Sequence, residues 1–438
     1  MKYSLPYFIY LVISTILITF LYPFILLYAL LKGIQDRFKQ RFGIYPQPTS
    51  QNLSGNPIIW IHAVSVGEVN VARAIINPLK KKLPNCSILL STTTFKGFDM
   101  AQSLVCNRVQ CIYAPIDYIL SVQKALKLFK PDILVLLETE IWPNWIMTCK
   151  QMGIKTVLIN GRISTRSINR YLKFKPFLKP ILAQMDAFSM ITQHDSKRIM
   201  LLGAANNRIV VHPNAKFDLL THELDSKCQE ILMKRFNLFN NDIVLVAGST
   251  RTGEDEIILD AFDHIHSIFP NAVLIIAPRH VNRSDKIVSI VKHRCLSCGL
   301  YHQYKYENKK RTETVIIVDT IGDLAQIYSI ATFVFCGASL VPLGGQNLLE
   351  AAIWGKPIFH GPYMDDFIEA RDLLFNASAS IPVNDSKDFI QKIIYYSHHL
   401  DEAKQIGKKA KQAILSRSGA AMHHADEIIR VLNHSSQV

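Results

Sequence analysis

Two carboxylates and one amine in the first half of the sequence have the residue types and positions that acid–base chemistry requires. Glu68 follows an apolar run at residues 58–61 and a turn of small residues, at the point where helical spacing begins. Glu138 directly follows a second apolar run, and Lys216 lies near the middle of the chain. A glutamate at the end of a strand can take a proton from a substrate, and a lysine can meet a phosphate or a developing negative charge.

Each carboxylate also has a purely structural interpretation. Glutamates are common in the first turn of a helix, where the helix dipole and unpaired N–H groups stabilise them. Glu68 could have only this role, and Glu138 and Glu140 could have it before a helix that begins at Pro143. The positions of these residues alone leave both interpretations open.

The second half of the chain carries residues suited to binding an anion. Turns that contain glycine follow predicted strands at Gly248 and at residues 344–347, and backbone N–H groups in such turns can hold a phosphate without a metal. Arg279 follows another predicted strand and can bind a phosphate through two parallel N–H groups. Asn347 and Glu350 have capping-box spacing, so Glu350 could instead cap its own helix.

Two series of short apolar runs, each alternating with helical patterns, position these residues. Continuous apolar strands between helices predict parallel sheets covered on both faces, which bind ligands at the carboxyl ends of their strands. We therefore expect an α/β fold with two Rossmann-like domains that face one another across a cleft. The expected strands are residues 58–61, 87–91, 109–113, 133–137, 156–159 and 187–192 in the first series, and 243–247, 273–277, 314–318, 333–336 and 357–359 in the second.

Residues 5–31 form an almost uncharged apolar run, longer than the roughly 20 residues needed to span a bilayer. Four basic residues follow this run and only Lys2 precedes it, so the positive-inside rule predicts that the rest of the chain is cytoplasmic. The four are Lys32, Arg37, Lys39 and Arg41. We expect an anchor with a basic juxtamembrane segment at residues 1–45, and domains at residues 46–218 and 219–438.

The net charge of +14 over 438 residues indicates either an acidic partner or a generally basic surface. The acidic partner could be nucleic acid, anionic lipid or a phosphorylated substrate, but aromatic RNP motifs and C2H2 spacing are missing, so we expect no nucleic acid. At residues 170–179, RYLKFKPFLK interleaves basic and aromatic residues. This segment fits a membrane surface or a plain amphipathic surface element equally well.

The sequence gives little support to metal or dinucleotide binding. Eight cysteines are scattered, and Cys295 and Cys298 lack the second pair that a zinc site needs, so we expect reduced thiols. Neither series of strands carries GxGxxG after its first strand, and the Walker A sequence is missing too. We expect no metal and no cofactor.

Eight motifs, in order behind one apolar run, resemble those of the 3-deoxy-D-manno-octulosonic acid (Kdo) transferases. They are HAVSVGE, LLETEIWPN, NGRIS, NAKFD, GSTRTGEDE, APRH, DTIGDL and GGQNLLEAA. The resemblance implies a GT-B fold with an N-terminal acceptor domain and a C-terminal donor domain. It also implies metal-independent, inverting transfer of Kdo from CMP-Kdo to the phosphorylated lipid A precursor, at the cytoplasmic face of a bacterial inner membrane whose anionic lipids are further partners.

The resemblance assigns roles by motif. Glu68 matches the general base, and Glu138 and Lys216 match residues that stabilise the transition state. The segments that hold CMP correspond to Pro278, Arg279, Ile321, Gly322, Asp323, Asn347, Leu348, Leu349 and Glu350. The chain departs from the family pattern at His212-Pro213, at Gln346 and Leu348, and at Asp323, where the family commonly has glutamate.

Two other functions remain open on the sequence. One is a GT-B enzyme that uses a UDP-sugar, such as another cell-envelope transferase or an epimerase. The other is a membrane-anchored scaffold with a degenerate GT-B fold. The presence of all three proposed catalytic residues argues against the scaffold.

Overall fold

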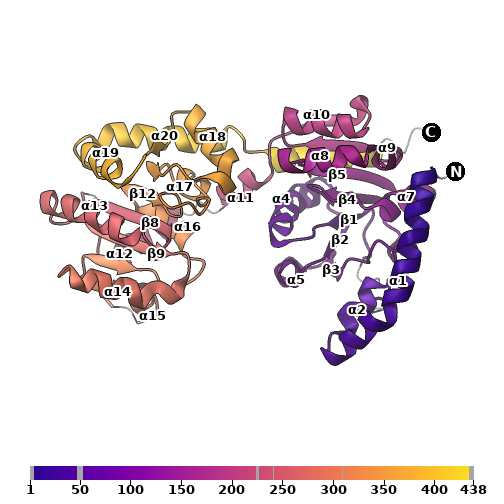
Figure 1. The fold of residues 1–438 in the computed structure, drawn as a ribbon, viewed down its shortest axis with the longest axis horizontal. Helices are drawn as coiled ribbons and strands as arrows, with labels where there is room; N and C mark the ends of the chain where they lie inside the picture. The colour runs from indigo at the N-terminus through magenta and orange to yellow at the C-terminus, as the bar shows by residue number, and fades with distance from the viewer. Residues whose placement is uncertain (1–3, 47–52, 223–225, 240, 308, 434–438) are drawn as a thin grey trace. The chain divides into compact units, whose positions relative to one another are not determined.

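The chain folds into two compact units, one of which receives both ends of the sequence. The computed structural model describes residues 4–46, 53–222, 226–239, 241–307 and 309–433. The N-terminal unit contains Met1–Leu219 together with Ser418–Val438, and the C-terminal unit contains Leu220–Arg417 (Figure 1). Each unit is built on its own parallel sheet.

The sheet of the N-terminal unit has seven parallel strands in the order β3-β2-β1-β4-β5-β6-β7. Its strands are β1 (Ile58–His62), β2 (Ser87–Thr92), β3 (Val109–Tyr113), β4 (Ile133–Leu137), β5 (Lys155–Gly161), β6 (Ala187–Met190) and β7 (Ile209–Val211). All six runs predicted in this half are strands. The edge strand β7 was not predicted, because it is three residues long and only partly buried.

Helices cover both faces of this sheet. They bury alternate strand residues in two separate clusters, one containing Trp60 and Leu134 and the other containing Ile59 and Ile133. The helices are α1 (Leu5–Leu31), α2 (Gln35–Arg41), α4 (Val66–Lys82), α5 (Phe95–Gln102), α6 (Ile119–Phe129), α7 (Pro143–Gln151), α8 (Thr165–Lys173), α9 (Lys175–Leu182), α10 (Gln193–Leu202), α11 (Lys216–His222) and α21 (Ala420–Asn433).

The C-terminal unit repeats this architecture with the strand order β10-β11-β9-β8-β12-β13-β14, again all parallel. Its strands are β8 (Val244–Thr250), β9 (Val273–Pro278), β10 (Cys298–Leu300), β11 (Val315–Ile317), β12 (Phe333–Cys336), β13 (Ile358–His360) and β14 (Ile381–Pro382). The five predicted strands are confirmed. The edge strands β10 and β14 were missed because they are too short to show a pattern.

The helices of the C-terminal unit pack around an aliphatic and aromatic core that includes Phe262, Phe335 and Phe389. They are α12 (Ser226–Arg235), α13 (Asp255–Ile268), α14 (Ser284–His293), α15 (Tyr301–Tyr306), α16 (Leu324–Ile327), α17 (Leu349–Ala352), α18 (Ile368–Asn376), α19 (Ser386–His398) and α20 (Leu400–Leu415). Parallel sheets covered on both faces therefore occur in both halves of the chain, as predicted.

The last helix corrects the predicted domain at residues 219–438. Helix α21 packs on α4, where Ala421, Ala425 and Ile428 join the core of the N-terminal unit. The carboxylate of Asp218 accepts hydrogen bonds from the backbone N–H groups of Gly419 and Ala421 at the start of this helix. The chain thus returns to its first unit, because the apolar face of α21 is buried there.

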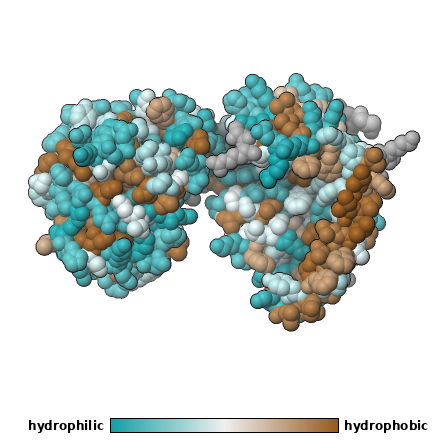
Figure 2. Space-filling view, in the orientation of Figure 1, coloured by the Kyte–Doolittle hydropathy of each residue, from teal (hydrophilic) through white to brown (hydrophobic). Residues whose placement is uncertain are grey.

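Helix α1 is the one helix in the described part of the chain that is long and apolar enough to cross a membrane. Figure 2 shows its exposed side chains as a continuous apolar stripe on the N-terminal unit. The hydroxyl of Tyr7 donates to Asn144 (2.9 Å) and that of Tyr10 donates to Asp117 (2.6 Å). Near the other end, the ring of Tyr22 lies 4.9 Å from that of Phe42. The helix is therefore attached to the N-terminal unit at both ends.

The basic and aromatic segment at residues 170–179 lies beside α1. The ring of Phe177 is 5.3 Å from that of Tyr10, while Phe174 and its neighbours Lys173 and Lys175 are exposed. An exposed aromatic ring between exposed lysines, next to an apolar helix, favours the membrane-surface interpretation of this segment.

Replacing Lys173, Lys175 and Lys179 with glutamate should weaken binding of the full chain to phosphatidylglycerol vesicles. Each lysine near an anionic surface contributes about 1 kcal/mol, so we expect a loss of at least about tenfold at low salt. The control replaces the exposed Lys404, Lys408 and Lys409 of α20, which makes the same change in charge. Vesicle sedimentation measures both variants. An equal loss in the control would favour the plain-surface interpretation.

Candidate active site

The residues predicted to do chemistry in the N-terminal unit lie where the strand order of its sheet reverses. Strands β1 and β4 are neighbours, but the next strand after β1 lies toward one edge of the sheet and the next strand after β4 lies toward the other edge. The loops after two such strands diverge and leave room for a ligand at their carboxyl ends. Glu68 follows β1 and Glu138 follows β4, so the two carboxylates flank this point.

The carboxylate of Glu68 is buried in the first turn of α4, with 7% of the residue exposed. It accepts hydrogen bonds from the backbone N–H of Val64 (2.8 Å) and the hydroxyl of Ser65 (3.1 Å). The first-turn position that the structural interpretation expected is therefore correct. Burial nevertheless raises the pKa of Glu68 to about 7, against the lowering effect of the Val64 N–H, and the nearby Glu140 and Glu138 raise the pKa further. Glu68 can therefore exchange a proton near neutral pH.

Lys216 and Glu138 lie beside Glu68. The ammonium nitrogen of Lys216 is 2.6 Å from a carboxylate oxygen of Glu138. The same nitrogen lies 3.9 Å from the position that a Cβ atom on Gly67 would occupy. The structure thus brings the three predicted residues together. Because Glu138 pairs with the ammonium group, the positive charge of Lys216 is balanced locally, and the donors to Glu68 in the described part of the chain are uncharged.

Polar contacts that the sequence did not predict hold the surrounding loops. The side chain of Asn160, in the NGRIS motif, accepts a hydrogen bond from the N–H of Ala215 (2.9 Å) and so fixes the residue before Lys216. The buried Asp117 accepts hydrogen bonds from Asn144 and Trp145 (3.2 Å each) in the first turn of α7. That helix begins directly after the loop that carries Glu138. Asn144 and Asn160 lie in two of the quoted motifs, LLETEIWPN and NGRIS, whereas nothing in the sequence pointed to Asp117.

His62, the other titratable residue at the end of β1, does not supply a second proton carrier. Its ring nitrogen Nδ1 lies 2.9 Å from the hydroxyl of Ser91, which also accepts a hydrogen bond from the indole N–H of Trp60. Burial lowers the pKa of His62 to about 3, so the imidazole is neutral at physiological pH. It serves to tie β1 to β2 behind the Glu68 loop.

The C-terminal unit has a cavity of about 320 Å³ at the corresponding position of its own sheet. The strand order reverses between β8 and β12, and the carboxyl end of β8 and the loop after β12 both contribute to the cavity. The lining residues are Ser249, Arg279, Gly322, Leu324, Ala325, Tyr328, Gln346, Asn347 and Glu350. Four residues predicted to hold an anion are thus brought to one cavity, although they come from three separate motifs.

The other predicted residues of these motifs do not line this cavity. Ile321 is 86% exposed, and Leu348 is buried. The carboxylate of Asp323 pairs with Lys305 (2.7 Å) and accepts a hydrogen bond from Thr320 (2.5 Å). The last two, Pro278 and Leu349, directly precede the lining residues Arg279 and Glu350 in the sequence. The carboxylate of Glu350 accepts a hydrogen bond from the Asn347 side chain (3.1 Å), a contact between two side chains that does not by itself cap the helix.

Two residues that the sequence did not single out shape this cavity. The buried carboxylate of Glu254 accepts hydrogen bonds from the N–H groups of Ala338, Ser339 and Leu340, at 2.7, 3.0 and 3.1 Å. It therefore joins the loop after β8 to the loop after β12. Tyr328 lines the cavity, and a Cβ atom on Gly248 would lie 1.9 Å from its hydroxyl oxygen. Glycine at the end of β8 makes room for this side chain.

Known sequences that are similar to this chain include several 3-deoxy-D-manno-octulosonic acid transferases. Residues 36–219 match the family described as 3-deoxy-D-manno-octulosonic-acid transferase. The chain is 34% identical, over 78% of its length, to a bifunctional glycosyltransferase/methyltransferase of Fusobacterium nucleatum, and spans about half (53%) of that protein. It is 28% identical to the 3-deoxy-D-manno-octulosonic acid transferase of Haemophilus influenzae, over 90% of both chains. A probable mitochondrial transferase of this kind from Arabidopsis thaliana is 29% identical over 77% of this chain and 75% of its own.

Solved structures with low sequence identity share the fold. The UDP-GlcNAc 2-epimerase of Neisseria meningitidis superposes with a TM-score of 0.58 and 13% identity, over 86% of this chain and 99% of the epimerase. A glycosyltransferase from Rickettsia africae gives a TM-score of 0.52 and 15% identity, over 87% of this chain and 98% of the glycosyltransferase. HepE of Anabaena in complex with UDP gives a TM-score of 0.55 and 14% identity, over 86% of this chain and 99% of HepE. The predicted GT-B class is confirmed.

The raised pKa of Glu68 predicts a pH-dependent effect on stability. The folded state keeps this proton up to about pH 7, whereas an ordinary glutamate loses it near 4.5. Ionisation therefore costs stability as the pH rises, and the full cost is present above pH 7. Glu68→Gln should raise the free energy of unfolding by about 1–3 kcal/mol at pH 8 and change it little at pH 4.5.

Thermal unfolding followed by tryptophan fluorescence measures this difference, because three of the four tryptophans, Trp60, Trp142 and Trp145, belong to the N-terminal unit. Glu369→Gln is the control, since Glu369 is an exposed glutamate in the first turn of α18. A stabilisation by Glu68→Gln that is equal at both pH values would contradict the raised pKa.

Proposed function

We propose that the chain, which matches the 3-deoxy-D-manno-octulosonic acid (Kdo) transferase family over residues 36–219, transfers Kdo from CMP-Kdo to a phosphorylated lipid A precursor. The observation that carries this proposal is Glu68, a buried carboxylate whose pKa is raised to about 7 and which lies beside the ion pair of Lys216 with Glu138. Such a group suits a reaction in which a neutral sugar hydroxyl must lose its proton as it attacks.

In the proposed reaction, Glu68 is the general base. It accepts the proton of an acceptor hydroxyl while the hydroxyl oxygen forms a bond to the anomeric carbon of Kdo. The bond from that carbon to the phosphate oxygen of CMP breaks in the same step, so the configuration is inverted. The ammonium group of Lys216, held by Glu138, stabilises the negative charge that develops during transfer.

The C-terminal unit is proposed to bind the donor. The Arg279 guanidinium, the backbone of Gly322 and the turn around Asn347 share one cavity, and such groups suit the phosphate of CMP as it leaves with a growing negative charge. Pro278, Ile321, Asp323, Leu348 and Leu349 are proposed to support these segments from positions outside the cavity. Arg279 and Lys216 supply positive charge, and we propose that transfer needs neither a metal ion nor a cofactor.

The proposed location follows from the apolar helix. We propose that α1 anchors the protein in a bacterial inner membrane, with both units on the cytoplasmic side. A lipid acceptor stays within the membrane, so an anchored enzyme meets it at a raised local concentration. The exposed apolar stripe of α1 and the basic segment beside it support this location.

Mass spectrometry of the reaction product tests the proposal. Purified protein incubated with CMP-Kdo and the tetraacylated lipid A precursor should add the mass of Kdo to the lipid, whereas UDP-sugars should give no product. Glu68→Ala should reduce transfer by at least about a thousandfold, because alanine leaves no group at this position that can accept the proton of the acceptor hydroxyl. The same variant should still fold and bind CMP-Kdo. Product formed from a UDP-sugar, or substantial turnover by Glu68→Ala, would overturn the assignment.

A further inference from the structure

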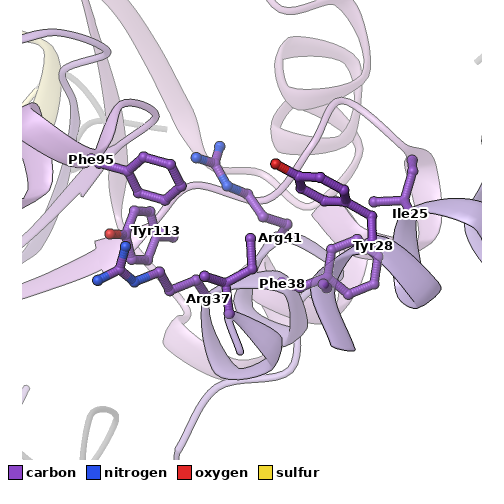
Figure 3. Close-up of a pocket in the computed structure, with 9 residues that line it drawn as sticks. Ile25, Tyr28, Arg37, Phe38, Arg41, Phe95 and Tyr113 are labelled. Atoms are coloured by element: carbon purple, nitrogen blue, oxygen red, sulfur yellow. The ribbon is translucent and has the colours of Figure 1, made fainter. Parts of the chain in front are cut away.

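The N-terminal unit has a pocket between the end of α1, helix α2 and the carboxyl end of β3 (Figure 3). Its volume is about 170 Å³, below the range of about 300–1,000 Å³ that is usual for a whole small molecule. Ile25, Tyr28 and Ala29, from the last turns of α1, form an apolar wall. Arg37 and Arg41 of α2 bring two guanidinium groups to it. We call it the Arg37–Arg41 pocket.

Aromatic rings hold the two guanidinium groups in place. Arg37 lies 4.9 Å from the ring centroid of Phe95 and 6.0 Å from that of Tyr113, and Arg41 lies 5.3 Å from that of Tyr113. Neither arginine forms an ion pair with a carboxylate in the part of the chain that the structure describes, whereas the neighbouring Lys39 pairs with Asp36. Two ordered cations without a counter-ion predict an anionic ligand.

The hydroxyl of Tyr113 points to the same conclusion independently. Tyr113 is 2% exposed, and its hydroxyl is buried without a hydrogen-bond partner among the described residues. Figure 3 shows this hydroxyl on the same side of the pocket as the Arg37 guanidinium. A buried hydroxyl without a partner costs free energy that a bound acceptor oxygen would recover. The ligand should therefore offer oxygen atoms to both groups, as a phosphate does.

The pocket is connected to the Glu68 loop by a short series of hydrogen bonds. Arg41 donates to the backbone carbonyl of Thr93. The N–H of Thr93 donates to the carbonyl of Val64 (3.3 Å), and the N–H of Val64 donates to the Glu68 carboxylate (2.8 Å). A ligand on the arginines would therefore bind to the same hydrogen-bonded loops that hold the proposed base, which favours a substrate over a bulk membrane lipid.

We propose that the Arg37–Arg41 pocket binds a phosphate group of the lipid acceptor, whose adjoining acyl chain lies against the end of α1. This inference rests on the proposed transferase function for the identity of the lipid. The apolar wall comes from the last turns of α1, the proposed membrane anchor, and the two cations lie directly after it, as a membrane-bound phosphorylated amphiphile requires. The small volume suits one group of the ligand and leaves the sugar to reach Glu68.

Binding to nanodiscs without donor tests the pocket separately from catalysis. Three phosphatidylcholine nanodiscs are compared, carrying the phosphorylated tetraacylated lipid A precursor, the same lipid after phosphatase treatment, or phosphatidylglycerol. Arg37→Gln should weaken binding to the first about tenfold, and Tyr113→Phe about three- to fivefold, because each removes a hydrogen bond to phosphate. Lys39→Gln, the same change in charge on the same helix, should bind like the wild type.

Arg37→Gln should bind the other two nanodiscs as the wild type does. The inference is overturned if Arg37→Gln has no effect, if Lys39→Gln has an equal effect, or if Arg37→Gln weakens binding to phosphatidylglycerol as much. The last result would mean that the pocket binds bulk anionic lipid.

Steady-state transfer distinguishes this inference from the proposed function. Arg37→Gln should raise the KM for the acceptor about tenfold and leave kcat and the KM for CMP-Kdo unchanged. If the wild type transfers Kdo and Arg37→Gln has the same acceptor KM, the pocket inference fails and the transferase function stands. If the wild type gives no transfer product but Arg37→Gln still loses phosphate-dependent binding, the transferase function fails and the phosphate site stands.

Discussion

The burial of the Glu68 carboxylate among uncharged donors is the constraint on which the proposed chemistry depends. A glutamate in the first turn of a helix is ordinarily ionised well below neutral pH, and an adjacent lysine would lower its pKa further. Here the nearby ammonium group of Lys216 is bound by Glu138, and among the residues that the structure describes Glu68 receives hydrogen bonds from Val64 and Ser65 alone. The ion pair therefore has two effects: it places a cation where negative charge develops, and it leaves the base able to accept a proton.

The same topological rule locates both candidate sites. In each sheet the strand order reverses once near the middle, between β1 and β4 and between β8 and β12. The loops after β1 and β4 carry the carboxylates. In the other unit the anion-binding cavity lies at the end of β8 and the loop after β12, and Arg279 after β9 and Gly322 after β11 complete it. Helix α1 and the Arg37–Arg41 pocket belong to the N-terminal unit, so the proposed contacts with lipid and the proposed base lie on one folded unit. The division of tasks between units thus follows from how parallel sheets bind ligands.

The sequence predicted the parts of this account that depend on local patterns. Apolar runs identified eleven strands, and residues at their carboxyl ends, such as Glu68 and Arg279, were recognised as candidates for chemistry. Contacts between distant segments could not be predicted in this way. The apolar face of α21 could have packed on either unit, and nothing local distinguished Tyr328, which lines the cavity, from Ile321, which is exposed. Glu254 and Asn160 were missed because their partners lie far along the chain or in another loop.

The pH dependence of transfer tests the central claim most directly. If Glu68 is the general base with a pKa of about 7, kcat/KM for the acceptor should fall about tenfold per pH unit below pH 7 and level off above it. In Glu68→Gln the residual rate should lose this dependence. A wild-type rate that stays constant from pH 5 to pH 9, or a Glu68→Gln variant that keeps the wild-type profile, would contradict the account.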